Sequence, residues 1–224
     1  MREQDPISYD QKADNVLKTL ASALQSSLPA VERPFLMITE GDVLRATTLY
    51  LLHPINLALN AKYEDTPIYC LSEDSKERIR CDITWKYRDG RDLKTIAVLE
   101  LKKRGALSWE DFERAESNAG NREDKMQEAY ANTDDGDDVA TTFKENAIPL
   151  SKQAAAYAIR QKTQFVGLFD WNYMFLFQFC QLNLAEKNIG DCAYGTWVQE
   201  TDSMLFRKTL FGFLAAACEA KIGT

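Results

Sequence analysis

The sequence predicts an α/β fold in one domain that spans residues 1–224. Three observations predict it. The chain is long enough for a sizeable core, and 45% of its residues are apolar. Two β-like segments, Glu77–Tyr87 and Leu93–Lys103, flank a hairpin signal at Asp89-Gly90. Helical segments lie on both sides of them, which gives the order helix, helix, β-meander, helix, strand, strand, helix.

Two helical regions precede the strands. Apolar residues at helical spacing predict a helix over Asp10–Ser27 and a second helical region over Thr39–Asn60. Thr39 is the expected N-cap of the second region, because acidic residues follow it in the first turn. Pro54 is expected to kink this region or to begin a new segment. His53, the only histidine, is expected to be a core residue rather than a ligand.

Five segments have the patterns of strands. Residues 67–71 form a short β-like run, and Glu77–Tyr87 alternates apolar with polar residues. Leu93–Lys103 contains a near-continuous apolar run, typical of a strand buried on both faces. Phe165–Phe169 and Tyr173–Phe179 are two further buried strands joined by a turn.

The later helices are predicted over Ser108–Tyr130, Leu150–Gln161 and Asp202–Lys221. Residues 182–195 have no regular pattern. The last helix is apolar nearly all round. This predicts deep packing, a homodimer interface, or contact with a partner domain.

Composition limits the classes of function. The net charge of −7 argues against a general polyanion-binding surface, so nucleic acid would be bound locally and with a metal ion. The five cysteines include no CxxC pair, which favours reduced thiols in an intracellular protein of the cytoplasm or nucleus over a disulfide framework. The start is polar and no apolar run approaches the roughly 20 residues of a membrane span.

Three charged residues at the predicted hairpin suggest chemistry. Glu100 and Lys102 are two residues apart on one strand and therefore share a face. Charges beside a buried run are costly unless they are paired or bound to metal. Asp82 and Glu100 are suited to hold Mg²⁺ or Mn²⁺, with Lys102 orienting a water or stabilising charge on a phosphate. Glu40 is either a helix-dipole partner or a third carboxylate of this site.

Register decides whether these residues meet. A two-residue Asp89-Gly90 loop with regular pairing would place Asp82 on the face opposite Glu100 and Lys102. An odd-numbered loop or a bulge near Arg88–Asp92 would return Asp82 to their face. The metal-site hypothesis therefore predicts such an irregularity.

In these residues the chain resembles the PD-(D/E)xK nuclease superfamily. Asp82 matches its Asp, and Glu100-Leu101-Lys102 matches its Glu-x-Lys. Gln153 and Tyr157 look like the QxxxY element of the RecB-like branch, on one face of a helix. The resemblance assigns Lys102, Gln153 and Tyr157 to catalysis and the two carboxylates to the metal.

The resemblance also implies a fold and a reaction. It implies a restriction-endonuclease-like core, α-β-β-β-α-β, with a central mixed sheet flanked by helices. This core is expected over about residues 39–180, with residues 182–224 as a C-terminal extension. It implies Mg²⁺-dependent hydrolysis of phosphodiester bonds, in DNA rather than RNA. Glu40 would match an acidic residue on the first core helix of some members. Cys81 departs from the family pattern, because it stands where the superfamily name has Pro.

The same residues are compatible with two alternatives to an enzyme site. Asp82 and Lys102 could form an ordinary cross-strand ion pair, with Glu100 a charge at a strand end. The chain could also be an inactive nuclease-like module, as part of a larger effector or toxin-like protein. Such a module would contact proteins through its final helix or bind nucleic acid without cleaving it.

Overall fold

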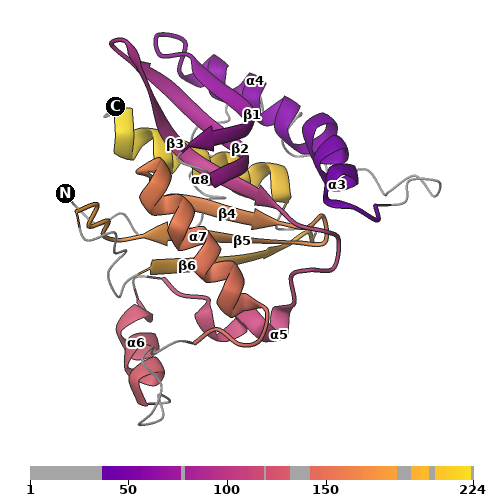
Figure 1. The fold of residues 1–224 in the computed structure, drawn as a ribbon, viewed down its shortest axis with the longest axis vertical. Helices are drawn as coiled ribbons and strands as arrows, with labels where there is room; N and C mark the ends of the chain where they lie inside the picture. The colour runs from indigo at the N-terminus through magenta and orange to yellow at the C-terminus, as the bar shows by residue number, and fades with distance from the viewer. Residues whose placement is uncertain are drawn as a thin grey trace.

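Six strands form one mixed sheet in the order β1-β2-β3-β4-β5-β6 (Figure 1). The computed structural model describes residues 37–222 apart from 77–78, 119, 132–141, 186–192 and 202–204. The strands are β1 (Ile68–Lys76), β2 (Ile79–Asp89), β3 (Asp92–Leu101), β4 (Phe165–Phe169), β5 (Tyr173–Phe179) and β6 (Ala193–Gln199). β3 and β4 pair in parallel, and the other four neighbouring pairs are antiparallel. The predicted α/β class is confirmed.

Helices cover both faces of the sheet. The parallel β3–β4 pair needs a long crossover, which holds α5, η2, α6 and α7. In Figure 1, α7 crosses in front of the sheet and α8 lies behind it. The helical elements are α3 (Glu40–Thr47), the π-helical turn η1 (Thr48–Leu52), α4 (His53–Lys62), α5 (Trp109–Phe112), the 3₁₀ turn η2 (Glu113–Ala115), α6 (Arg122–Ala131), α7 (Ala147–Gln161) and α8 (Phe206–Ile222).

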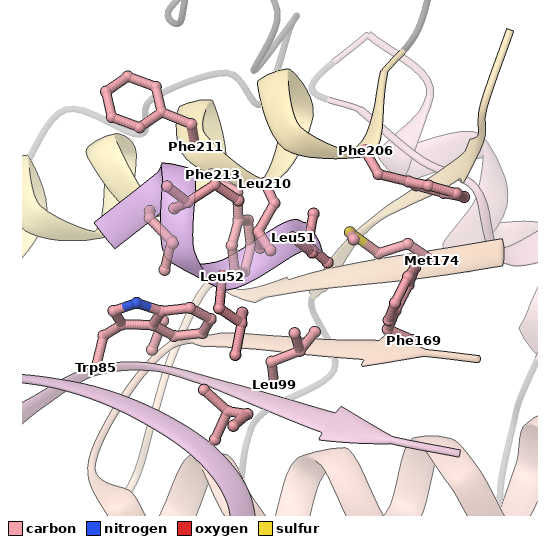
Figure 2. Close-up of a cluster of buried hydrophobic side chains, with 14 of the residues drawn as sticks. Leu51, Leu52, Trp85, Leu99, Phe169, Met174, Phe206, Leu210, Phe211 and Phe213 are labelled. Carbon is pink, nitrogen blue, oxygen red and sulfur yellow. The ribbon is translucent and has the colours of Figure 1, made fainter. Parts of the chain in front are cut away.

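The larger core layer lies between the sheet and the helices α3, α4 and α8. Figure 2 shows side chains of this layer from η1, α8 and the strands: Leu51, Leu52, Trp85, Leu99, Phe169, Met174, Phe206, Leu210, Phe211 and Phe213. Each fully buried apolar side chain of this size contributes about 1.5–3 kcal/mol. Twelve residues of α8 are buried, so its apolar surface is explained by deep packing within the chain.

The helical region expected over Thr39–Asn60 begins as predicted. Thr39 is the N-cap of α3, and its side chain and that of Asp42 form a reciprocal capping box. Pro54 lies in the first turn of α4, directly after η1. His53 is exposed, so its expected place in the core was wrong: Leu52 and Ile55 occupy the buried positions around it. The helix predicted over Asp10–Ser27 lies outside the described residues.

Three further segments differ from the prediction. β1 continues to Lys76 through residues whose composition is typical of a turn. The helix expected over Ser108–Tyr130 is broken into α5, η2 and α6. β6 was not predicted, and together with α8 it completes the sheet and one core layer from residues expected in an extension. Gly195 within β6 permits a close approach, because a Cβ there would lie 2.5 Å from the Ala115 carbonyl oxygen.

Cys180 is disulfide-bonded, which contradicts the expectation that all five thiols are reduced. Cys81 and Cys218 are free and buried, and Cys70 is free and half-buried. Among the described residues, no helix combines the length and apolarity that crossing a membrane requires.

Candidate active site

A bulge in β3 brings Asp82 and Glu100 opposite each other. Asp89 pairs with Asp92 across the two-residue turn Gly90–Arg91, so the loop does not consist of Asp89-Gly90. The register then shifts between Trp85 and Lys86, where Ile96 is the extra residue of β3. The expected irregularity exists, but it lies at Ile96 and not near Arg88–Asp92.

The consequence for the site follows from the pairing beyond the bulge. Ile83 pairs with Leu99, and the same register continued by one residue sets Asp82 against Glu100. Without the bulge, every side chain of β3 after Ile96 would face the other side of the sheet relative to β2. The bulge therefore decides whether the two carboxylates can act together.

β2 is itself irregular at Asp82. Cys81 packs in the core layer below α7, whereas Ile83 packs in the layer below α8, although alternate residues of a regular strand share a face. Opposite Asp82, Glu73 of β1 has φ 54° and is left out of the strand pairing. This local twist lets Asp82 Oδ2 accept a hydrogen bond from the Leu101 amide at 2.8 Å, at the end of β3.

Glu100 is the centre of the constellation, and it is only 6% exposed. Its Oε1 accepts from Lys102 Nζ at 3.0 Å and from Gln153 Nε2 at 2.8 Å. Gln153 Nε2 also donates to the Tyr157 hydroxyl at 2.6 Å. The face of α7 that carries Gln153 and Tyr157 therefore lies against the end of β3. Glu100 Oε2 is buried and has no hydrogen-bond partner in the described part of the chain.

The charges of the site are unbalanced. Burial, followed by repulsion from Asp82, raises the pKa of Glu100, and Lys102 opposes this only in part. Burial also raises the pKa of Asp82, against the lowering effects of the Leu101 amide and of Lys102. The pKa of Tyr157 is raised by burial and by the Glu100 charge, which keeps the hydroxyl protonated. Two carboxylates thus share one lysine.

Glu40 stands apart from this group. It is the first residue of α3 and is exposed. Its charge reaches the site, since it is among the influences that raise the pKa of Asp82. Across the described residues, no three His, Cys, Asp or Glu side chains are gathered closely enough to hold a metal ion. Glu40 therefore does not complete a three-carboxylate site with Asp82 and Glu100 in this structure.

The two carboxylates nevertheless fit a magnesium ion. Mg²⁺ is commonly bound through one or two protein carboxylates, with waters and substrate phosphate oxygens as the other ligands. Glu100 Oε2 supplies a buried acceptor that has no hydrogen-bond partner among the described residues. A divalent cation beside it would also offset the repulsion that raises both carboxyl pKa values.

Asp170 is a buried residue near the site that the sequence patterns did not single out. It lies directly after β4 and accepts hydrogen bonds from the amides of Leu107 (2.9 Å), Asn172 (3.0 Å) and Tyr173 (2.8 Å). It thereby ties the segment that follows Lys102 to the β4–β5 turn. An Asp directly after a buried strand is a signal for such a turn. Its bond to Leu107, 63 positions away, had no local signal.

A second polar cluster fixes the far end of α7. Gln161 accepts from Thr95 Oγ1 at 3.1 Å and donates to Asp74 Oδ2 at 3.1 Å. Asp74 in turn pairs with the buried Lys86 at 2.7 Å. Since Gln153, Tyr157 and Gln161 recur every four residues on α7, this cluster helps to set the rotation at which the helix presents Gln153 and Tyr157.

Comparisons of the chain with protein-family models, with curated proteins and with solved structures found no match. A function for this protein is therefore inferred from its residues and their geometry.

Proposed function

We propose that this protein is a metal-dependent nuclease that hydrolyses phosphodiester bonds, with DNA as the preferred substrate over RNA. The observation that carries the proposal is the half-buried Asp82 beside the buried Glu100, with Lys102 paired to Glu100 and one Glu100 oxygen without a hydrogen-bond partner among the described residues. Holding two carboxylates together without a metal is costly, because burial and mutual repulsion both disfavour the ionised form of Glu100. A divalent cation bound between the two carboxylates would offset their repulsion and give Glu100 Oε2 a partner.

The topology supports the same proposal. A helix (α3), three antiparallel strands (β1–β3), a helix (α7) and a parallel strand (β4) follow one another in the order of a restriction-endonuclease-like core. The candidate site lies where β2 is distorted and β3 ends. It is also the place where the superfamily that the sequence resembles carries its Asp and its Glu-x-Lys.

Each side chain has a part in the proposed reaction. Asp82 and Glu100 would hold Mg²⁺ or Mn²⁺, which would supply Lewis-acid stabilisation of phosphate charge and a more acidic water. Lys102 Nζ, now 3.0 Å from Glu100 Oε1, would orient the attacking water or stabilise charge on the phosphate. Gln153 holds the Glu100 carboxylate in place, and the same amide nitrogen donates to the Tyr157 hydroxyl.

The direct test is cleavage of plasmid and labelled oligonucleotides, both DNA and RNA, with Mg²⁺, Mn²⁺ or EDTA. We expect metal-dependent cleavage by the wild type and a loss of about 10²–10³-fold in Lys102→Met, the size typical of removing one charge-stabilising donor. Lys208→Met, on α8 outside the site, is the matched control. Equal activity of the wild type and Lys102→Met would refute the proposal.

The alternative is a non-catalytic module that contacts a partner or a second copy through the final helix. One observation in its favour is removed, because the apolar residues of α8 are buried in the chain's own core. Binding of nucleic acid without any metal-dependent cleavage would favour the remaining version of this alternative.

A further inference from the structure

Arg104 occupies a fixed place beside the candidate active site. Its Nε donates to Asn172 Oδ1 at 2.9 Å, while its side chain is otherwise exposed. No described residue bonds its two terminal nitrogens. An arginine held by Nε alone presents those two nitrogens as a planar fork, the geometry that matches phosphate oxygens.

The fixed place is built from several contacts. The Lys102 amide donates to the Phe169 carbonyl at 2.8 Å, which clamps the end of β3 to the end of β4. Asn172 lies three residues after Phe169 and accepts the hydrogen bond from Arg104 Nε. The backbone amide of Asn172 donates to Asp170 Oδ1. Asp170 also holds the Leu107 amide, so it joins both sides of this support.

The chain between Lys102 and Arg104 is short. Two residues span at most about 7 Å, so Arg104 stays close to the lysine of the proposed reaction. Gly105 follows at φ 80°, a left-handed conformation that turns the chain away immediately after Arg104. The Arg104 guanidinium therefore lies at a turn, and its hydrogen bond to Asn172 positions it without a bound substrate.

We propose that Arg104, positioned by Asn172 on the Asp170 turn, binds a backbone phosphate of the nucleic acid next to the phosphate that is cleaved. Cleavage of the neighbouring phosphate rests on the proposed nuclease function, but the binding itself does not. The ligand of this site is a phosphodiester monoanion. Arg104 binds it, and Asn172 and Asp170 position Arg104.

The test measures binding of fluorescein-labelled single- and double-stranded DNA in EDTA, across a range of salt concentrations. We expect Arg104→Gln to weaken binding by up to about fivefold, the size of one exposed charge pair. We expect the slope of log affinity against log salt to fall by about 0.7–0.9, the release expected for one phosphate contact. Arg91→Gln removes the same charge at the β2–β3 turn and should leave the slope unchanged.

Asn172 supplies a sharper readout. Asn172→Ala should weaken binding less than Arg104→Gln, and should have no further effect when Arg104 is already Gln, because both act on one contact. Additive losses in the double variant would overturn the positioning role. Equal effects of Arg104→Gln and Arg91→Gln, or no DNA binding by the wild type, would overturn the phosphate site.

The results separate this proposal from the nuclease proposal. Binding that depends on Arg104, without metal-dependent cleavage, would support the phosphate site and refute the enzyme. Cleavage that is accompanied by binding insensitive to Arg104 would do the reverse.

Discussion

Replacing Glu100 by Gln should stabilise the metal-free protein, although it removes half of an ion pair. Asp82, Glu100 and Lys102 together carry a charge of −1, and the substitution brings this partly buried group to zero. The raised pKa of Glu100 leads to the same expectation. The environment of Glu100 disfavours the ionised carboxylate, so a neutral side chain of the same shape is more stable there at neutral pH. Lys102 keeps Asp82 as a neighbouring carboxylate.

The magnitude follows from the buried charge. The amide that replaces the carboxylate still leaves one polar atom without a partner, so the gain comes from removing a desolvated charge, and the weaker contact of Lys102 with a neutral oxygen offsets part of it. A net gain of about 1 kcal/mol raises Tm by roughly 2–4 °C in a chain of this size. Magnesium at tenfold its Kd should add about 1.4 kcal/mol, roughly 3–6 °C, to the wild type and nothing to Glu100→Gln.

Thermal unfolding followed by calorimetry measures the Tm of the wild type and of Glu100→Gln, each in EDTA and in Mg²⁺. Glu64→Gln, an exposed glutamate after α4, is the matched control and should behave as the wild type in both buffers. A Glu100→Gln variant that melts below the wild type in EDTA would show that Glu100 is a structural partner of Lys102. Equal Mg²⁺ stabilisation of the variant and the wild type would remove Glu100 from the metal site.

Three further predictions concern Lys102, the pH dependence of metal binding and the packing around Gly195. Lys102→Met should lose cleavage but keep the Mg²⁺-dependent rise in Tm, because the cation is held by Asp82 and Glu100; a loss of both would contradict the assigned roles. Folding raises the pKa values of the Asp82 and Glu100 carboxyls above their ordinary values of 3.8 and 4.5. The protonated carboxyls therefore stabilise the fold fully below those ordinary values, and this stabilisation is lost as the pH rises through the raised pKa values. The Mg²⁺ increment in Tm should therefore be largest at neutral pH and shrink towards pH 4, and a pH-independent increment would count against these ligands. Gly195→Ala should lower Tm by roughly 4–8 °C, because the added Cβ would lie 2.5 Å from a carbonyl oxygen and a ring carbon and overpack the site by about 2 kcal/mol. Gly41→Ala is the control: its Cβ would have its nearest contact at 3.6 Å, so the substitution should be tolerated.

The sequence was informative where local pattern and burial coincide. β4 and β5 were predicted to the residue, because both are continuous apolar runs bounded by turn residues. The N-cap at Thr39 followed from its local chemistry alone. Parity of the β2–β3 register could also be worked out in advance, since Asp82 and Glu100 can share a face only if one residue is added somewhere in the hairpin.

The remaining features depend on tertiary contacts. The bulge lies at Ile96 rather than at the turn, inside an apolar run that gives no sign of where the extra residue falls. β6 was not predicted because Gly195 interrupts its pattern, and the reason for that glycine is a carbonyl from η2. Leu107, which donates to Asp170, and Asn172, which accepts from Arg104, lie 63 and 68 positions from their partners in the sequence.

The central claim is that Asp82 and Glu100 hold a divalent cation, and a crystal soaked in manganese tests it most directly. We predict an anomalous peak between the two carboxylates within bonding distance of Glu100 Oε2, the atom that has no hydrogen-bond partner among the described residues. The peak should be absent from an Asp82→Asn crystal treated in the same way. A well-ordered wild-type crystal with no peak at this position, at a manganese concentration that supports any observed cleavage, would contradict the claim.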